Sequence, residues 1–436
     1  MQVDDLELEN LEVLDLQLNN LVNDQLYNLS KFKKLHTLDV SFNNVDLTHI
    51  HIVKSLTKLT MVSCELKNIY LISSLDNLEE LDLSSNILDN QQLNNISKFK
   101  KLHTLDVSFN KVDLTHIHNI TSLTKLSMRN CELKNINLIS SLVNLKELDL
   151  SYNRDFDLSP LQQVRSLTKL YMNNCDIMKI DQMAQLTNLE VLNISDNQLL
   201  TINSVGSLVN LKELNISQNK SIDINPLKNL VGLIKLNMES CNLRHLSALK
   251  SLNNLQTLNI YNNPNINISE LYYVKNITHL NLADCNLVSI YVLRPLMNLE
   301  ELNVKTNNIV YLDAELNQMT KLEKLIAERN RIRDFSQLEK HPNYNNINEN
   351  GCNYQCDQQY DQEDPSQAEL YLANKFRKIE LPNIQLKLIP HKSLKMAFKN
   401  YKQDINATIN IAQQSQLQFT ANVVSLFQLL NQFGFE

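Results

Sequence analysis

A sequence repeat with a nearly constant period dominates this chain of 436 residues. The pattern Lxx(L)x(hydrophobic)xx(N/C)x(hydrophobic) occurs fifteen times between residues 11 and 335. From Leu123 to Leu299 successive copies start 22 residues apart, and the earlier copies start 21 to 24 residues apart. A unit of this length cannot bury its apolar residues alone, so consecutive copies must stack into a solenoid.

Each copy contains a short segment in which apolar and polar residues alternate, as a β-strand requires. One strand per copy builds a parallel sheet, and the rest of the copy returns along the convex side. There the apolar residues Leu199, Ile202, Val205 and Leu208 recur every three residues, a spacing that suits short 3₁₀ turns. The sequence therefore predicts an α/β solenoid, with a curved parallel sheet on its concave face and 3₁₀ or irregular segments on its convex side.

One inward position of the repeat alternates between an amide and a thiol. It holds asparagine in ten copies and cysteine in five, namely Cys64, Cys131, Cys175, Cys241 and Cys285. A buried Asn can satisfy the peptide groups of the turn after each strand, and a small buried Cys with a weak S–H donor can fill the same position. No two of these cysteines occupy adjacent copies, and a separation of two coils, about 10 Å, is too long for a disulfide. We predict that these thiols are structural.

The full motif, as in LEVLNISDNQLLTINSVGSLVN (189–210), resembles the leucine-rich repeat in its 22-residue subclass. That subclass is found in the leucine-rich regulatory subunit of protein phosphatase 1 and in bacterial internalins. The resemblance covers residues 11 to about 335 and implies a scaffold that binds a protein on its concave face. The chain lacks an [RK]-[VI]-x-[FW] phosphatase docking motif, and its C-terminal cap is shorter than that of the phosphatase subunit.

The repeat rhythm stops after Phe335, where FSQLEKHPNY resembles a cap with Phe335 and Leu338 covering the last coil. We predict a solenoid at 1–340, a polar acidic linker at 341–365 and a helical tail at 366–436. In the tail, residues 391–433 contain neither Pro nor Gly and carry apolar residues in steps of 3 and 4. This stripe can pack on the solenoid, on the tail itself, or on a second chain as a homodimeric coiled coil. Intramolecular packing is slightly favoured, since charge pairing beside the stripe is missing.

The net charge of −7 argues against a nucleic-acid partner, and no apolar run is long enough to cross a membrane. The N-terminal sequence MQVDDLELENLEVLDL is acidic and already follows the repeat, unlike a secretory signal. We expect a cytoplasmic protein.

No catalytic motif is present, and four glycines leave little room for a phosphate-binding loop. The pair Cys352 and Cys356 lacks a second Cys/His pair at zinc-ligand spacing. Two further His pairs, at 49/51 and 116/118, have no carboxylate or thiol cluster beside them. We therefore expect no enzyme activity, no cofactor and no metal site.

Functional residues in such a fold belong on the concave face, where exposed side chains form columns across the strands. The first column alternates Lys and Glu, which predicts a structural ladder of ion pairs. The second column changes from Asp in the N-terminal half, including Asp82, Asp106 and Asp149, to Asn in the C-terminal half. This acidic half either recognises a cationic partner or is compensated by water and by Lys58 or Lys125.

In the third and fourth columns we expect bulky side chains among serines and asparagines: Phe42, Phe109, Arg129, Tyr152, Tyr171, Tyr261, His279 and Lys305. Aromatic and Arg side chains are the usual anchors of protein interfaces. Phe42 and Phe109 have the alternative of packing at the strand edge. Arg129, Tyr152 and Tyr171 come from consecutive copies and are predicted to form a binding cluster.

Three functions remain open. The first is a non-catalytic adaptor that binds a protein partner on the concave face, in the manner of the phosphatase regulator. The second is an internalin-like surface adhesin, and the third is a cytoskeletal or ciliary structural protein that assembles through its tail.

Overall fold

The structure is a computed structural model, which describes residues 10–344 apart from 68, 313, 333–335 and 337. Most of the predicted linker, the whole predicted tail, Phe335, Cys352 and Cys356 lie outside the described residues. The predictions made for those segments therefore stay predictions.

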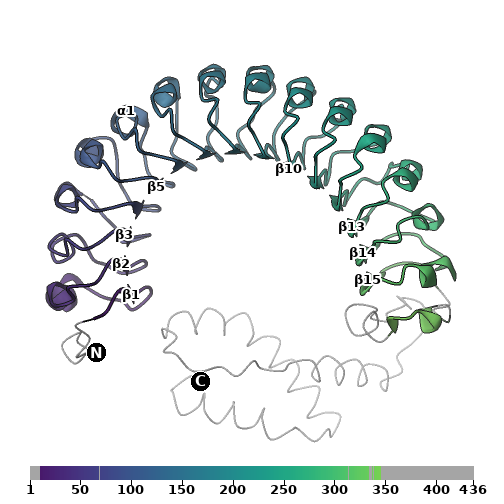
Figure 1. Cartoon of the computed structure of the whole chain (residues 1–436), viewed down its shortest axis with the longest axis horizontal. Helices are drawn as coiled ribbons and strands as arrows, with labels where there is room; N and C mark the ends of the chain where they lie inside the picture. The colour runs from purple at the N-terminus through teal and green to yellow at the C-terminus, as the bar shows by residue number, and fades with distance from the viewer. Residues whose placement is uncertain (1–9, 68, 313, 333–335, 337, 345–436) are drawn as a thin grey trace, which may run out of the picture. The chain divides into compact units, whose positions relative to one another are not determined.

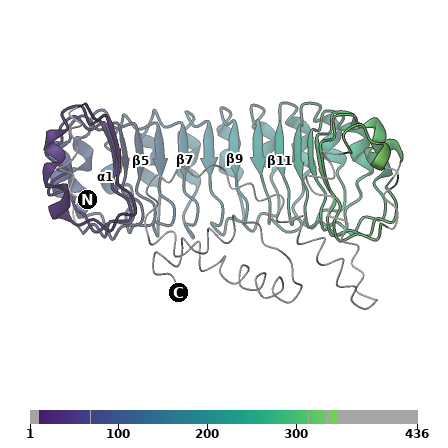
Figure 2. The same cartoon turned by 90° about the horizontal axis from the view of Figure 1, so that it is seen from below.

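The described part is one curved, unclosed solenoid (Figure 1). Its fifteen three-residue strands form a single sheet in which each strand pairs only with its sequence neighbours. The pairing is parallel and in register, as between Glu213, Lys235 and Val191 at the start of neighbouring strands. Seen from below, the strands stand side by side along the inner face of the arc (Figure 2). The strands are β1 (Val13–Asp15), β2 (Thr37–Asp39), β3 (Lys58–Thr60), β4 (Glu80–Asp82), β5 (Thr104–Asp106), β6 (Lys125–Ser127), β7 (Glu147–Asp149), β8 (Lys169–Tyr171), β9 (Val191–Asn193), β10 (Glu213–Asn215), β11 (Lys235–Asn237), β12 (Thr257–Asn259), β13 (His279–Asn281), β14 (Glu301–Asn303) and β15 (Lys324–Ile326).

The convex side carries short helices, almost all of the 3₁₀ type, which confirms the expectation from the three-residue spacing. One α-helical turn, α1, interrupts this series. The elements are η2 (Asn23–Lys31), η3 (Tyr70–Ser74), η4 (Gln92–Lys98), α1 (Leu114–Ile117), η5 (Asn137–Ser141), η6 (Ser159–Gln163), η7 (Asp181–Gln185), η8 (Asn203–Ser207), η9 (Asn225–Asn229), η10 (Ser247–Ser251), η11 (Ser269–Tyr273), η12 (Tyr291–Leu293), η13 (Ala314–Gln318) and η14 (Leu338–Lys340).

The core is a continuous aliphatic column between the sheet and the convex helices. The predicted convex anchors Leu199, Ile202, Val205 and Leu208 are all buried, as is Leu236 at the centre of β11. Burying each such side chain contributes about 1.5–3 kcal/mol. Since every coil packs on its neighbours, the stability of each coil depends on the coil before it and the coil after it.

The Asn/Cys column forms a buried spine of hydrogen bonds at the exit of the strands. Asn153 donates to the carbonyl oxygen of Met128 in the preceding coil and accepts from the backbone N–H of Cys131 at 2.9 Å. The thiol of Cys131 donates to the equivalent carbonyl of Val107, with an S–O distance of 3.4 Å. The five cysteines are free and buried, as predicted. After each cysteine, but not after most asparagines, the next residue adopts a left-handed backbone, as Glu132 does with a φ of 55°.

The C-terminal end of the described chain closes the core. Leu338 of η14 is buried, as expected for a cap. The cap continues to Tyr344, because His341 is buried and its ring contacts the carbonyl oxygen of Met319 at 3.2 Å. Asn343 also donates to the carbonyl oxygen of Thr320. The described solenoid therefore runs at least four residues past position 340.

Candidate functional site on the concave face

The first exposed column of the sheet is the predicted ladder of ion pairs. Lys58 lies 2.8 Å from Glu80, Lys235 lies 2.7 Å from Glu213, and Lys324 lies 2.8 Å from Glu301. Glu147 bridges Lys125 at 2.7 Å and Lys169 at 3.3 Å. Burial opposes ionisation of Glu147, but the two ammonium groups outweigh it and lower the pKa of its carboxyl. These side chains are partly solvated and mutually satisfied, so this column is structural.

In the second column, Asp and Asn make the same local hydrogen bond. The carboxylate of Asp82 accepts from the backbone N–H of Ser84 at 2.9 Å, and Asp149 accepts likewise from Ser151. Farther along the sheet, the side-chain oxygen of Asn237 accepts from the N–H of Glu239 at 3.1 Å. Because the amide oxygen of Asn accepts the same hydrogen bond as the carboxylate of Asp, folding does not require the negative charge of the N-terminal half.

The charge of these carboxylates is in fact disfavoured. Burial raises the pKa of Asp82, and Asp106 and Asp39 raise it further. Burial also raises the pKa of Asp149, with Arg129 and the bond from Ser151 acting in the opposite direction. Lys58 and Lys125 are paired with Glu80 and Glu147 of the first column. Partly buried carboxylates with raised pKa values are a common mark of functional sites.

The fourth column lies just past the strands, in a left-handed backbone conformation. Its residues include Phe42, Phe109 and Tyr152, with φ angles of 58°, 58° and 63°. Residues other than Gly, Asn and Asp seldom adopt this conformation, which costs bulky residues about 1–2 kcal/mol. Even so, all three rings stay exposed, at 48%, 45% and 42% of their accessible surface. Phe42 and Phe109 are thus about half covered, which leaves the alternative of packing at the strand edge untested.

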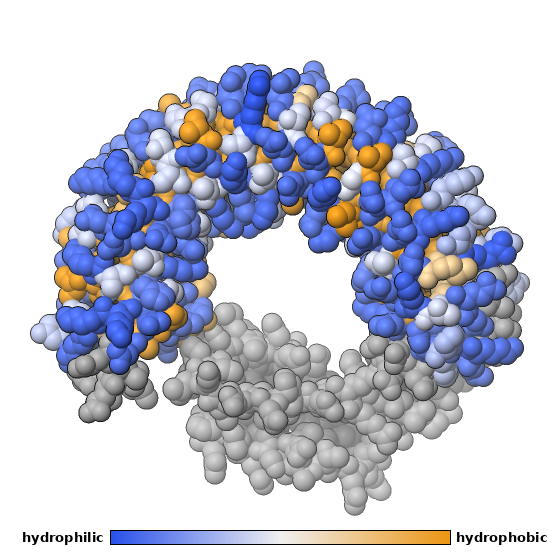
Figure 3. Space-filling view, in the orientation of Figure 1, coloured by the Kyte–Doolittle hydropathy of each residue, from blue (hydrophilic) through white to orange (hydrophobic). Residues whose placement is uncertain are grey.

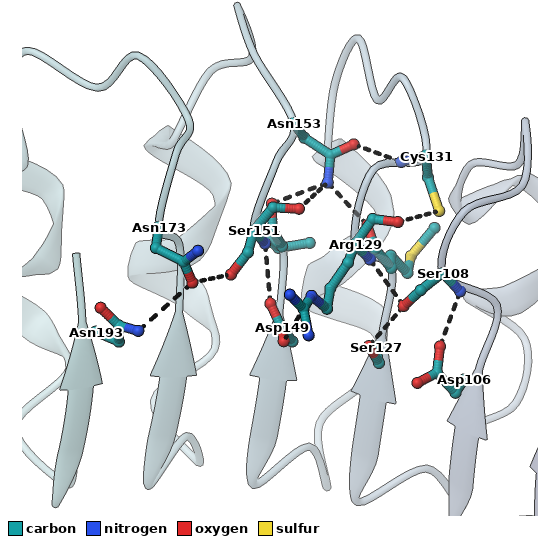
Figure 4. Close-up of polar contacts among 12 residues, drawn as sticks. Asp106, Ser108, Ser127, Arg129, Cys131, Asp149, Ser151, Asn153, Asn173 and Asn193 are labelled. Carbon is teal, nitrogen blue, oxygen red and sulfur yellow. Dashed lines mark hydrogen bonds and ion pairs between the residues drawn. The ribbon is translucent and has the colours of Figure 1, made fainter. Parts of the chain in front are cut away.

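The predicted cluster is centred on Arg129, which follows β6 (Figure 4). Its guanidinium carbon lies 5.4 Å from the centre of the Tyr152 ring, within the range of a cation–π contact. Its Nε lies 3.7 Å from Asp149, too far for a hydrogen bond, and this buried atom has no hydrogen-bond partner. The structure thus brings together Arg129, Tyr152 and Asp149, and leaves one donor of the guanidinium unsatisfied.

Tyr171 lies in a different column from the one predicted. It ends β8 and pairs in register with Asp149 and Asn193, so it belongs to the second column. His279 starts β13 beside Glu301, so it belongs to the first column. Both were wrongly assigned to the third and fourth columns. Tyr171 still comes from the coil next to Tyr152, and burial together with Glu147 raises its pKa.

The other predicted residues form no single group with this cluster. Asp82 and Asp106 share the acidic column on β4 and β5. Tyr261 follows β12 and His279 starts β13, several coils away. Lys305 lies 2.6 Å from Glu328, which gives it a structural partner.

A hollow of about 410 Å³ beside Tyr152 was not predicted. It lies where the loops after β6, β7 and β8 meet, and its lining is Asn130, Glu132, Lys134, Tyr152, Arg154, Asp155 and Asn174. Arg154 is held there by Asp176 at 3.2 Å and by the side-chain oxygen of Asn174 at 3.2 Å. The inner edge of the arc is mostly hydrophilic (Figure 3), so a ligand here would meet a wet, polar surface with a few rings.

Within the described residues, no three His, Cys, Asp or Glu side chains are placed to hold a metal ion. None of the helices in this part of the chain is long and apolar enough to span a bilayer.

Comparison with known proteins points to one repeat family. The family described as "Leucine Rich repeats (2 copies)" matches residues 165–205. A comparison with curated proteins gives no match.

Several solved structures share the fold. An internalin from Listeria monocytogenes is 26% identical over 66% of this chain and 86% of its own, with a TM-score of 0.58. A leucine-rich repeat protein from Leptospira interrogans is 25% identical over 77% and 93%, with a TM-score of 0.61. TLR13, solved in complex with ssRNA13, is 19% identical over 74% and 59%, with a TM-score of 0.53, and shares the fold alone.

Proposed function

Since the chain is a leucine-rich repeat protein, we propose that it is a non-catalytic scaffold that holds a protein partner on its concave face. The binding surface would centre on β4 to β8, where the acidic column meets Arg129, Tyr152 and Tyr171. Proteins of this family are generally interaction modules, and several leucine-rich repeat structures match the chain over most of its length.

The observation that carries this proposal is the arrangement around Arg129. The left-handed turn itself recurs at this position in every described coil and belongs to the frame. What the frame does not require is a bulky exposed Tyr at the turn, a guanidinium over its ring and the charge of a half-buried Asp. Features that lower stability and are not required by the fold indicate a functional surface. Aromatic and Arg side chains are also the residues that most often dominate binding free energy.

The test is affinity capture with the intact chain and with an Arg129→Ala/Tyr152→Ala/Tyr171→Ala variant. We expect the variant to capture at least tenfold less partner protein than the unchanged chain. A matched control replaces Lys235, Glu213 and Lys324 of the structural ladder with Ala and should retain the partner. Equal capture by both variants and the unchanged chain would remove the proposal. RNase treatment of the captured material decides whether an RNA ligand contributes.

The internalin match favours a second candidate, an internalin-like surface protein. Fractionation and imaging of a tagged chain separate it from the cytoplasmic scaffold that we propose.

The analogy with the phosphatase regulator rests on the repeat subclass alone and predicts phosphatase among the captured proteins. Assembly through residues 391–433 predicts a homodimer in light scattering that disappears when residues 366–436 are removed.

A further inference from the structure

Two consecutive blocks of three coils on the concave face have related sequences. Residues 31–51 recur at 98–118 with one substitution, and the correspondence continues, with more substitutions, to Asn86 and Asn153 at a constant offset of 67 residues. The offset spans three coils, so β2–β4 match β5–β7. The two blocks lie next to each other on the sheet and face the same side.

The two blocks are held by matching bonds. The thiols of Cys64 and Cys131 each lie 3.4 Å from the carbonyl oxygen of the preceding coil. The first-column pairs, Lys58–Glu80 and Lys125–Glu147, measure 2.8 and 2.7 Å. These bonds of the frame are therefore equivalent in the two blocks.

Both blocks present the same exposed group to solvent. Phe42 and Phe109 have the same φ of 58°, and each donates its backbone N–H to the next coil at 2.7 Å. Each ring is about half exposed, although the conformation is unfavourable for Phe. Three residues before each Phe, Asp39 and Asp106 occupy the second column and accept equivalent bonds from Ser41 and Ser108.

The blocks differ where the predicted cluster lies. Val62 and Ser85 of the first block correspond to Arg129 and Tyr152 of the second. The first block thus offers the Phe and Asp pair alone, and the second block adds the guanidinium and the phenol ring. A ligand that contacts the Phe and Asp of both blocks therefore finds two similar positions, of which only the second has Arg129 and Tyr152 beside it.

We infer that the concave face has two docking positions, at Phe42/Asp39 and Phe109/Asp106, for an extended protein segment that carries two cationic–apolar elements. This inference rests on the proposed function and specifies its partner. Each Asp carboxylate bonds the residue that directly precedes the Phe. A Lys or Arg suits each position, because its long stem can pack on the Phe ring while its charged head reaches the carboxylate. Three strand spacings separate the positions by about 14 Å, which an extended chain covers in about four residues.

The test uses three synthetic peptides as probes. The first carries two Phe-Lys pairs about four residues apart, the second carries one pair, and the third carries the two pairs directly adjacent. Fluorescence anisotropy measures the Kd of each peptide for the full chain. We expect the first peptide to bind at least tenfold more tightly than the other two, because the second contact is intramolecular.

Single variants then separate the positions. Phe42→Ser or Phe109→Ser should each reduce binding of the first peptide to within about twofold of the one-pair peptide, and the double variant should abolish it. Ile87→Ser, which replaces an apolar side chain that is 68% exposed in the loop after β4, is the matched control and should change nothing. Because the replaced rings are exposed, thermal unfolding should confirm that each variant folds.

Three results would overturn the inference: equal affinity for the first two peptides, an unchanged advantage after either Phe substitution, or no binding of the first peptide. If the Arg129/Tyr152/Tyr171 variant loses its captured partner while the peptides bind equally, the proposed function stands and the two-position inference fails. If that variant keeps its partner while the peptide advantage needs both Phe residues, the two positions stand and the proposed Arg129 centre fails.

Discussion

At the residue level, cysteine and asparagine share one task in the buried spine. The thiol of Cys175 donates to the carbonyl of Leu150, the same type of group that Asn197 reaches in Met172. Asparagine also accepts from backbone N–H groups of the preceding coil, as Asn197 does from Cys175 and Ile177. The backbone N–H groups of Cys64, Cys131, Cys175 and Cys285 are satisfied in this way by the asparagine of the following coil.

Burial also sets the reactivity of these thiols. It raises the pKa of Cys64, Cys175, Cys241 and Cys285 from 9.0 to about 11, and that of Cys131 to about 12. At pH 8 the thiolate fraction of the folded protein is thus lowered about 100-fold or more. The stability linked to the neutral thiols is full below pH 9 and declines as the pH rises through 11.

We therefore predict very slow alkylation of these five cysteines in the folded chain at pH 8. Mass spectrometry after timed iodoacetamide treatment measures it, with the guanidinium-unfolded chain as the fast reference. Folded-state labelling as fast as in the unfolded chain would mean that the spine is not buried.

A second residue-level prediction concerns Asp82. Its pKa is raised in the folded state, so ionisation of its carboxyl lowers the free energy of unfolding. The stabilisation that comes from the neutral carboxyl is complete below the unfolded pKa of about 3.9 and is lost as the pH rises through the folded pKa. Asp82→Asn keeps the bond from Ser84 and removes the charge. The variant should melt about 1–3 °C higher at pH 7 and equal the parent near pH 3.

Asp113→Asn is the control of opposite sign. Burial opposes ionisation of Asp113, but the hydrogen bonds of Thr115 and Asn90 and the nearby His116 together lower its pKa. It should melt no higher than the parent at pH 7. Lower stability of Asp82→Asn at pH 7 would contradict the electrostatic account of the acidic column.

At the level of elements, the repeat made the frame predictable, because each coil solves the same packing problem with the same residues. The strands, the 3₁₀ turns, the ion-pair column and the buried Asn/Cys column all follow from periodicity and residue type. The candidate site was harder to predict from the sequence. The contact between Arg129 and Tyr152 depends on side-chain torsions, and the hollow beside Tyr152 is built from three coils. The left-handed conformation of Phe42 and Phe109 runs against the preference of Phe and could not be predicted from it.

The spine can be tested at Asn219, between β10 and η9. Its amide donates to the carbonyls of Ile194 and Ile216 and accepts from the N–H of Leu199. Asn219→Ala leaves these buried groups unpaired and should cost about 1–3 kcal/mol. Asn219→Cys, kept reduced, retains a donor and should lose clearly less. Urea unfolding measures both, and equal losses would show that the thiol does not replace the amide donor.

At the level of the whole molecule, each strand of the described solenoid pairs with its sequence neighbours alone, so whole coils should be removable. Deleting residues 31–97 removes three coils and joins Ser30 to Lys98, which restores the original sequence at the junction. We predict a folded solenoid of twelve strands with cooperative unfolding. Circular dichroism and small-angle scattering check it.

A deletion of 31–86 provides the contrast, since it removes no whole number of coils and breaks the register. It should unfold at lower temperature and expose apolar surface to a dye. If both deletions behave alike, the coil is not the unit of this fold.

The single-file order of the sheet, β1 to β15 without a crossover, has a mechanical consequence. Tension applied across the described solenoid, from β1 to β15, loads every inter-coil junction in series, because the strands of this part pair only with their neighbours. The arc should first straighten like a spring and then yield one coil at a time. Each release of 22 residues would lengthen the chain by about 7 nm.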